Sequence, residues 1–269
     1  MQKSCKINWL LTTTSKNISM LSEKDTVFKS YNVCLKDTVK NFTKGLFYSL
    51  FDEDYYKKNI AKVEDTFLSI FKKLRSDEGQ EIWDLFKNEF PNIRKKLDLD
   101  ALAIEQNDPA TKSLEEVYLA CPGFHAIAIH RLSHQLYKFN CFVISRMMSE
   151  YIHGVTGIDI HPGATIGDSF FIDHGTGIVI GETSIIKDRV KIFQGVTLGG
   201  IQVKKSMSAT KRHPTIENDV IIYANATVLG GDIVIGANSI IGANVWITQS
   251  VPENSLVTYQ SEIKISTRK

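Results

Sequence analysis

Two short polar segments in the second half of the chain hold residue types suited to acid–base chemistry and to carboxylate binding. The first is Asp173-His174-Gly175, where an imidazole stands between an acid and a glycine. Imidazole titrates near neutral pH, so His174 is a candidate general base, although a turn histidine bonded to backbone would look the same in sequence. A general base needs an acceptor that orients its other nitrogen, and Asp159 and Asp173 are the candidates. Spacing alone does not place Asp159 beside His174.

The second segment is Arg212-His213-Pro214. A guanidinium suits a bidentate grip on a carboxylate, and the proline restricts the backbone that follows it. From the residues alone, the end of a surface loop is an equally good interpretation of this segment.

A six-residue repeat must position both segments. We expect its aliphatic members to face inward: Ile160, Ile166, Ile172, Ile180, Ile186, Ile192, Leu198, Ile216, Ile222, Val228, Ile235, Ile241 and Ile247. A step of six is typical of a chain that turns after each short strand, and three steps close a coil of about 18 residues. A second series (Val234, Ile240, Trp246) fits almost as well, and we favour the first because glycines flank it.

The repeat is interrupted where the polar segments lie. Ile172 and Ile180 are eight residues apart instead of six, and the gap contains His174. Residues 199–213 show no repeat and are interpreted as an extended loop. Insertions of this kind commonly carry function in repeat proteins. Because the interior of a coil is apolar, we expect His174 to be exposed at its interruption.

The first half of the chain has helical periodicity instead. Its apolar sets are Phe67, Leu68, Phe71 and Leu74, then Ile82, Leu85, Phe86 and Phe90, then Leu114, Val117, Tyr118 and Cys121. We expect the second helix to end at Pro91, and Asp108 to cap a helix that starts near Thr111. The predicted order is an N-terminal extension (1–20) that need not be ordered, an α-helical domain (21–152), a β-helix (153–252) and a C-terminal tail (253–269).

Composition narrows the function classes. The 269 residues are 43% apolar and 23% charged, which is ordinary for a globular protein and excludes a wholly disordered chain. A net charge of +2 argues against nucleic-acid and membrane-surface binding, and the apolar runs are too short to span a bilayer. The four cysteines form no C-x-x-C pair, which favours reduced thiols and a cytoplasmic location.

The motifs together resemble those of serine O-acetyltransferases, of the hexapeptide-repeat acyltransferase family. They come in the family's order and spacing: Asp108-Pro109-Ala110, Gly123-Phe124-His125-Ala126, Asp159-Ile160-His161-Pro162-Gly163-Ala164, the run from Asp173 to Glu182, Val196-Thr197-Leu198-Gly199-Gly200 and Arg212-His213-Pro214. The resemblance covers roughly residues 105 to 255. It implies an α+β chain, with an N-terminal α-helical domain followed by a left-handed parallel β-helix.

The resemblance also implies a reaction and an assembly. The family transfers acetyl from acetyl-CoA to the hydroxyl of L-serine, the first step of L-cysteine biosynthesis from serine. Acetyl-CoA is then a co-substrate, and neither a permanently bound cofactor nor a metal is expected. The family forms homotrimers or dimers of trimers, with each active site between two neighbouring β-helices. L-Cysteine resembles serine and is expected to inhibit.

Residue roles follow from the same resemblance. His174 would be the general base and Asp159 would orient it. Asp108 and Asp173 would hold the serine ammonium, while Arg212 would hold its carboxylate with help from His213, both from the adjacent subunit. CoA would contact the backbone near three small residues, Gly200, Ala224 and Ala243.

The chain departs from the family at one point, and three alternative functions stay open. The chain ends in Lys269 instead of the isoleucine that many relatives insert into O-acetylserine sulfhydrylase, which argues against that enzyme complex. An acetyltransferase for a sugar or an antibiotic is the first alternative. A zinc lyase that uses His161, His174 and His213 is the second, although these histidines lack the required spacing. A non-catalytic scaffold is the third.

Overall fold

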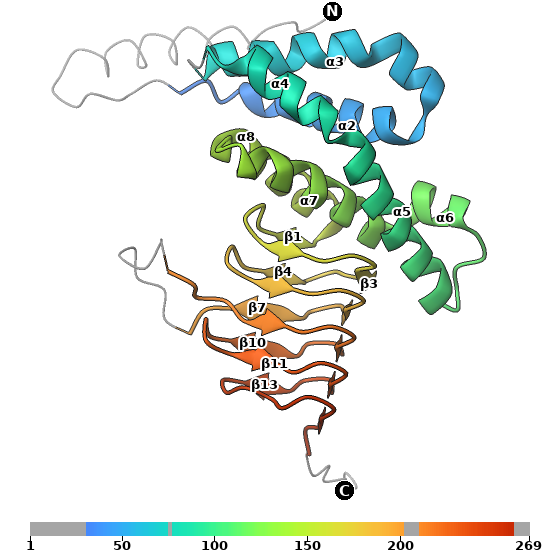
Figure 1. The fold of residues 1–269 in the computed structure, drawn as a ribbon, viewed down its shortest axis with the longest axis vertical. Helices are drawn as coiled ribbons and strands as arrows, with labels where there is room; N and C mark the ends of the chain where they lie inside the picture. The colour runs from blue at the N-terminus through green and yellow to red at the C-terminus, as the bar shows by residue number, and fades with distance from the viewer. Residues whose placement is uncertain (1–30, 75–76, 202–209, 261–269) are drawn as a thin grey trace, which may run out of the picture. The chain divides into compact units, whose positions relative to one another are not determined.

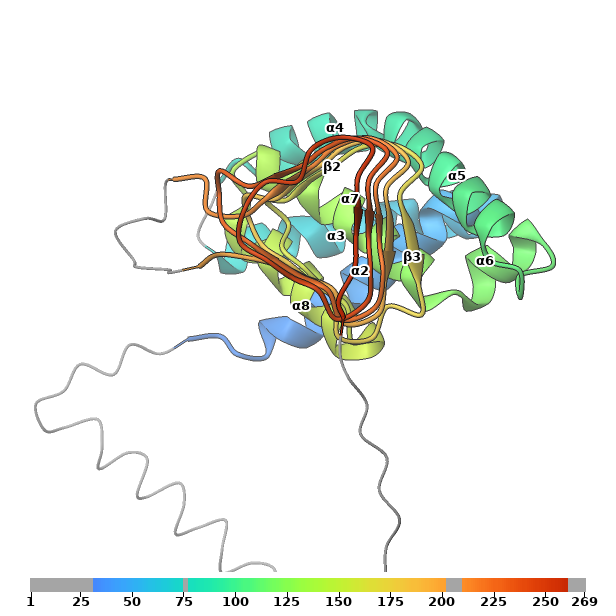
Figure 2. The same cartoon turned by 90° about the horizontal axis from the view of Figure 1, so that it is seen from below.

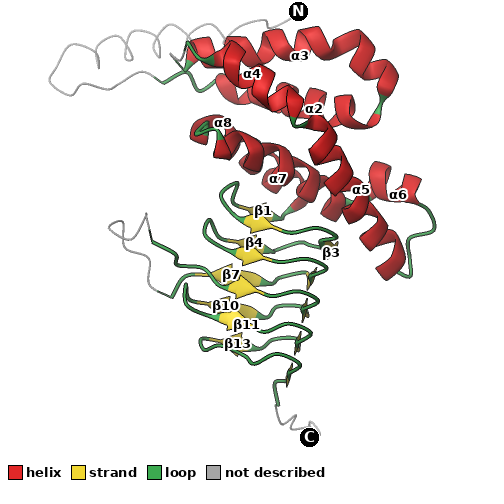
Figure 3. Ribbon diagram, in the orientation of Figure 1, coloured by secondary structure: helices red, strands yellow, loops and turns green. Residues whose placement is uncertain are grey.

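A computed structural model describes residues 31–74, 77–201 and 210–260 (Figure 1). The expectations for residues 1–20 and for the chain end at Lys269 fall outside these ranges. The compact unit that is described below begins at Leu35. Within it, helices come first and short parallel strands follow, as the sequence predicts (Figure 3).

The helical half consists of seven helices among the described residues. They are α2 (Leu35–Phe51), α3 (Glu53–Lys73), α4 (Gly79–Asn88), α5 (Phe90–Asn107), α6 (Leu114–Ala120), α7 (Pro122–Lys138) and α8 (Phe142–Thr156). Helix α7 is buried along most of its length, because it packs against α8, against α5 and against strand β3 (Phe171–Asp173). This central helix therefore carries contacts from the helical half to the strands.

Two helix boundaries differ from the sequence-based expectation. Pro91 does not end a helix: α4 stops at Asn88, and Pro91 lies in the first turn of α5, where a missing N–H costs nothing. Asp108 is not an N-terminal cap. It ends α5, and the next helix is capped by Ser113, whose hydroxyl accepts from the Glu116 N–H. An aspartate suits both situations, so local sequence could not distinguish them.

The strand half is a β-solenoid with three faces. Its strands are β1 (Asp159–Ile160), β2 (Thr165–Ile166), β3 (Phe171–Asp173), β4 (Val179–Ile180), β5 (Ile185–Ile186), β6 (Lys191–Phe193), β7 (Thr197–Gly199), β8 (Thr215–Ile216), β9 (Ile221–Ile222), β10 (Thr227–Leu229), β11 (Val234–Ile235), β12 (Ile240–Ile241), β13 (Trp246–Ile247) and β14 (Leu256–Val257). Every third strand joins the same parallel sheet, in the orders β1-β4-β7-β10-β13, β11-β8-β5-β2 and β14-β12-β9-β6-β3. Viewed along the stack, the coils superimpose as a three-sided outline (Figure 2). Its handedness stays a prediction.

The inward-facing series is the one flanked by glycines. All of its members are buried, and Ile180 pairs with Leu198, which pairs in turn with Val228. The competing series faces outward, since Val234 is 37% and Trp246 is 69% exposed. The choice between the two series is confirmed.

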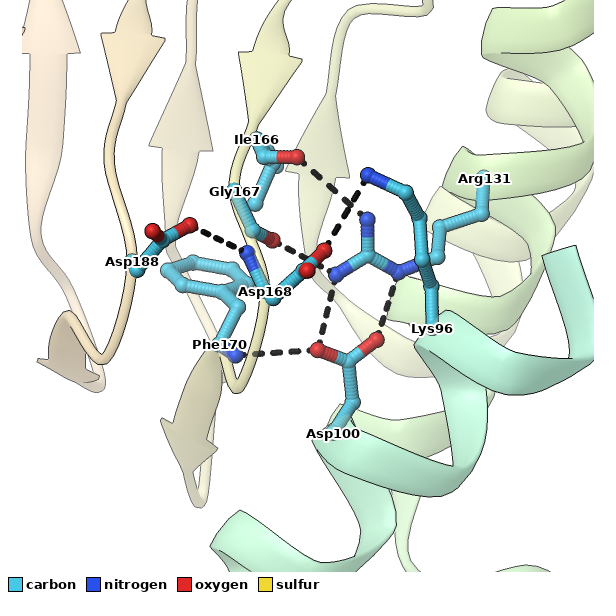
Figure 4. A network of polar contacts seen from close by, with 8 residues as sticks. All are labelled: Lys96, Asp100, Arg131, Ile166, Gly167, Asp168, Phe170 and Asp188. Atoms are coloured by element: carbon cyan, nitrogen blue, oxygen red, sulfur yellow. Dashed lines mark hydrogen bonds and ion pairs between the residues drawn. The ribbon is translucent and has the colours of Figure 1, made fainter. Parts of the chain in front are cut away.

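A buried ion pair joins the helices to the first coil (Figure 4). The Arg131 guanidinium on α7 donates to Asp100 on α5 through Nε and Nη2, at 2.5 and 2.7 Å, and to the Gly167 carbonyl at 2.7 Å. The backbone N–H of Phe170 donates to Asp100 at 2.9 Å. The Arg131 side chain is 6% exposed and the Asp100 side chain is fully buried. Separating the helices from the coil would leave these charged groups without their partners, so the pair fixes the two parts to one another.

In the part of the chain that the structure describes, no helix combines the length and the apolar character needed to cross a bilayer.

Candidate functional site

His174 stands at the corner between β3 and β4. Its backbone is left-handed, with φ 55°, and Gly175 and Gly177 follow with φ 90° and 82°. A Cβ on Gly175 would lie 2.4 Å from the Ile158 side chain, so only glycine fits the turn. The imidazole is 74% exposed. The two extra residues of the repeat thus build a rigid corner that presents His174 outward.

The resemblance assigns two carboxylates, Asp173 and Asp108, to the substrate ammonium. Asp173 Oδ1 is 3.9 Å from His174 Nδ1. Asp108, at the end of α5, accepts from the Ala110 N–H and the Thr111 hydroxyl, both at 2.8 Å. Burial raises the pKa of the Cys121 thiol, and the charges of Asp108 and Asp173 raise it further. The shared role that the resemblance gives to Asp108 and Asp173 stays a prediction.

Asp159 lies on the solenoid face that begins at the same corner. Its N–H donates to the Ile178 carbonyl at 2.9 Å, and Gly177 likewise donates to Gly157 at 2.8 Å. Within the described ranges, however, no hydrogen bond joins the Asp159 carboxylate to His174. Instead, a carboxylate oxygen of Asp159, a carboxylate oxygen of Glu150 and a ring nitrogen of His153 lie within 4.8 Å of one another.

Arg212 and His213 occupy the corner that leads into β8. The Thr183 hydroxyl accepts both backbone N–H groups, at 2.9 and 3.1 Å. His213 is 7% exposed as a residue, and its Nδ1 accepts from the Thr183 N–H at 3.0 Å. Burial, followed by the Arg212 charge, lowers the pKa of His213 to about 4. The ring is thus a neutral, fixed group at neutral pH.

Sequence reasoning gave no role to the groups that hold the Arg212 side chain. Its guanidinium donates to the Glu182 carboxylate, which also accepts from the Tyr137 hydroxyl on α7 at 2.6 Å. Glu182 belongs to one of the matched motifs, but Tyr137 is distant in sequence and no local pattern pointed to it. Neither residue could be assigned without the fold.

The two corners lie on different edges of the solenoid. Strand β4 runs between them, from the His174 corner to the Gly181–Glu182 corner, which stacks on that of Arg212. Gly200 lies on the Arg212 edge, whereas Ala224 and Ala243 lie at turns on the His174 edge. One chain therefore does not gather all the predicted site residues into one groove.

The zinc-lyase alternative finds no support in this arrangement. His161 and His213 lie on the Arg212 edge and His174 on the other. Over the described ranges, the cluster with ligand atoms close enough to share an ion is Glu150, His153 and Asp159, which contains none of the three.

Comparisons with known proteins find similar sequences and structures. No family model matches the chain. A plasmid-encoded serine acetyltransferase of Synechococcus elongatus is 47% identical over 194 residues, which cover 70% of this chain and 60% of that relative. A serine acetyltransferase of Bacillus licheniformis is 49% identical over 163 residues, covering 61% of this chain and 73% of that relative.

Solved structures resemble the chain over most of its length. Serine acetyltransferase isoform 3 of Entamoeba histolytica, in complex with cysteine, has a TM-score of 0.75 and 34% identity, and the match covers 97% of this chain and 96% of that one. A Neisseria gonorrhoeae serine acetyltransferase in complex with serine has a TM-score of 0.61 and 30% identity, covering 88% of this chain and 98% of that one. A serine acetyltransferase complex with CoA has a TM-score of 0.59 and 28% identity, covering 93% and 88%.

Proposed function

The chain belongs to the serine acetyltransferase family, and from that premise we propose that it transfers the acetyl group of acetyl-CoA to the hydroxyl of L-serine. The products are O-acetyl-L-serine and CoA, and the reaction is the first step of L-cysteine biosynthesis from serine. The observation that carries the proposal is the exposed imidazole of His174 at a left-handed corner of the solenoid, with the Asp173 carboxylate 3.9 Å from it. An acceptor that has both an ammonium and a hydroxyl suits this set of groups.

His174 acts as the general base. It takes the proton of the serine hydroxyl as the oxygen attacks the thioester carbonyl, and the tetrahedral intermediate then collapses with loss of the CoA thiolate, which recovers a proton. A positioned base contributes about 10²–10⁴-fold to such a step. Asp159 orients the imidazole, which its place on the face starting at the same corner supports. No acyl-enzyme is needed.

The substrate site is shared between two copies of the chain. Asp108 and Asp173 of one copy hold the serine ammonium, and Arg212 and His213 of its neighbour hold the carboxylate. The separation of the two edges in one chain supports this arrangement, which a homotrimer or a dimer of trimers supplies. CoA lies in the same groove, where the Gly200 edge of one copy meets the Ala224 and Ala243 edge of the next.

L-Cysteine inhibits by occupying the serine subsite. A solved relative in complex with cysteine supports this proposal. Inhibition should be competitive with L-serine, and unchanged activity at saturating cysteine with limiting serine would contradict it.

The free thiols of Cys34, Cys121 and Cys141 support a cytoplasmic location.

An acceptor comparison tests the proposal. Purified protein is given acetyl-CoA with L-serine, or with amino sugars and aminoglycosides, and CoA release is followed while mass spectrometry identifies the product. We expect release to depend on L-serine and to yield O-acetyl-L-serine. Preference for a sugar acceptor would support the alternative acetyltransferase, and no release with any acceptor would contradict both.

A further inference from the structure

The guanidinium of Arg212 donates to Glu182, which is in turn bonded to Tyr137 from a distant part of the chain. Glu182, in the coil above it, accepts from Arg212 Nη2 through one carboxylate oxygen. The other oxygen accepts from the Tyr137 hydroxyl at 2.6 Å, so the contact extends into helix α7. Only 13% of the Arg212 side chain and 26% of Glu182 are exposed, so the three groups form a partly desolvated row.

The Tyr137 hydroxyl has little freedom of its own. Its ring packs edge-on against Phe142, with centroids 4.9 Å apart, and against His161, at 5.8 Å. Burial and the hydrogen bond to Glu182 raise the pKa of Tyr137 to about 12, so the phenol remains a donor. Burial opposes ionisation of Glu182, but the hydrogen bonds from Tyr137 and Arg212 lower its pKa overall. Across the neutral pH range, Tyr137 therefore stays protonated and Glu182 stays ionised.

We propose that Glu182 and Tyr137 are positioning residues that fix the orientation in which Arg212 receives the carboxylate of the amino-acid substrate. This rests on the proposed function, which gives Arg212 that role. The reason is geometric, because a planar guanidinium recognises a carboxylate well only when its donors face both oxygens, and a free arginine side chain samples many rotamers. Ordering the side chain before binding removes that entropic cost from the binding step.

The backbone around Arg212 is fixed separately by Thr183. Its hydroxyl accepts from the N–H groups of Arg212 and His213. Backbone position therefore does not depend on Glu182, and a change at Glu182 or Tyr137 should alter the guanidinium without moving the corner. This separation allows the side-chain effect to be tested alone.

The test compares two acceptors in the full-length assembled protein. L-Serinamide keeps the ammonium and hydroxyl of L-serine but has no carboxylate for Arg212. For Tyr137→Phe and Glu182→Ala we expect kcat/KM for L-serine to fall by roughly 10-fold, mainly through KM, as for the loss of one hydrogen bond to a charged group. Glu182→Gln, which keeps an acceptor oxygen, should lose less. The kcat/KM for L-serinamide and the KM for acetyl-CoA should stay within about 2-fold.

A matched control is available in the helical half. Tyr118 also donates to a carboxylate, Asp98 at 2.8 Å, which in turn accepts from Arg94. Tyr118→Phe therefore removes a hydroxyl of the same kind outside the row, and we expect no selective effect on L-serine.

The outcomes separate this proposal from the proposed function. Arg212→Lys should impair L-serine far more than L-serinamide; equal losses would refute the role of Arg212 itself. If Arg212→Lys is selective but Tyr137→Phe and Glu182→Ala are not, only the positioning role is wrong. Tighter serine binding by Glu182→Gln would also overturn it, because Glu182 would then compete with the substrate.

Discussion

His174 and Arg212 stand on different edges of one β-solenoid, with the face that carries β4 between them. If both residues act on one serine molecule, they must come from different copies of the chain. An exposed imidazole and a nearly buried guanidinium fit this division, since one projects from its corner and the other is held against its own coil.

Complementation tests this division. His174→Asn and Arg212→Ala should each be nearly inactive alone. When the two are unfolded together and reassembled at equal amounts, about one quarter of the intersubunit sites receive both native residues, so we expect about a quarter of wild-type activity. No recovery in verified mixed assemblies would mean that the two residues do not meet across an interface.

The fit between Gly181 and His213 gives a second prediction. A Cβ on Gly181 would lie 2.1 Å from the His213 ring. We expect Gly181→Ala to raise the KM for L-serine and to lower stability by about 1–3 kcal/mol, because the ring must move. Gly154→Ala is the matched control, since Gly154 is an exposed residue of α8 and nothing lies within 4 Å of its Cβ position. It should be neutral or stabilising, and equal effects of the two substitutions would be inconsistent with this steric account.

The Asp100–Arg131 pair predicts a large loss of stability. In Asp100→Asn the buried guanidinium loses its counter-charge, and we expect the free energy of unfolding to fall by about 3–5 kcal/mol in denaturant titrations. Asp219, which pairs with Arg189 through two contacts at 2.7 Å while 38% exposed, provides the comparison. Asp219→Asn should cost at most about 1 kcal/mol. Similar costs at both positions would show that burial does not set the strength of the pair.

The buried His213 predicts a pH dependence of stability. Its pKa is lowered from 6.5 to about 4 in the folded state, so the folded chain binds fewer protons than the unfolded chain between these values. The stability that the neutral His213 contributes to the folded state is fully present above pH 6.5 and is lost as pH falls towards 4. His213→Asn, whose side-chain oxygen can still accept from Thr183, should lose less stability over this window than wild type. The other histidines whose pKa values are lowered by burial, His130, His134 and His161, are present in both proteins. Parallel pH profiles would contradict the prediction.

The sequence predicts the periodic parts of the molecule best. Repeated burial of one side chain in six leaves a strong pattern, so the inward series from Ile160 to Ile247 is confirmed. Single residues at boundaries carry less information, which is why the sequence pattern places Pro91 and Asp108 at the wrong ends of helices. Both segments named first, at His174 and Arg212, do lie at corners of the solenoid.

Contacts between distant segments could not be predicted. Asp100 and Arg131 look like surface charges on amphipathic helices, and only the docking of α5 and α7 on the first coil buries them. The same holds for Tyr137 and Glu182, which are joined by the fold and not by spacing.

The most direct test of the account is the rate of CoA release from acetyl-CoA and L-serine by His174→Asn. Asparagine tolerates the left-handed backbone that His174 adopts, and the side chain is 74% exposed, so folding and assembly should be preserved and can be verified by sizing and thermal unfolding. We expect kcat/KM to fall by about 10²–10⁴-fold. Release at the wild-type rate by a correctly assembled variant would contradict the role of His174 as the base.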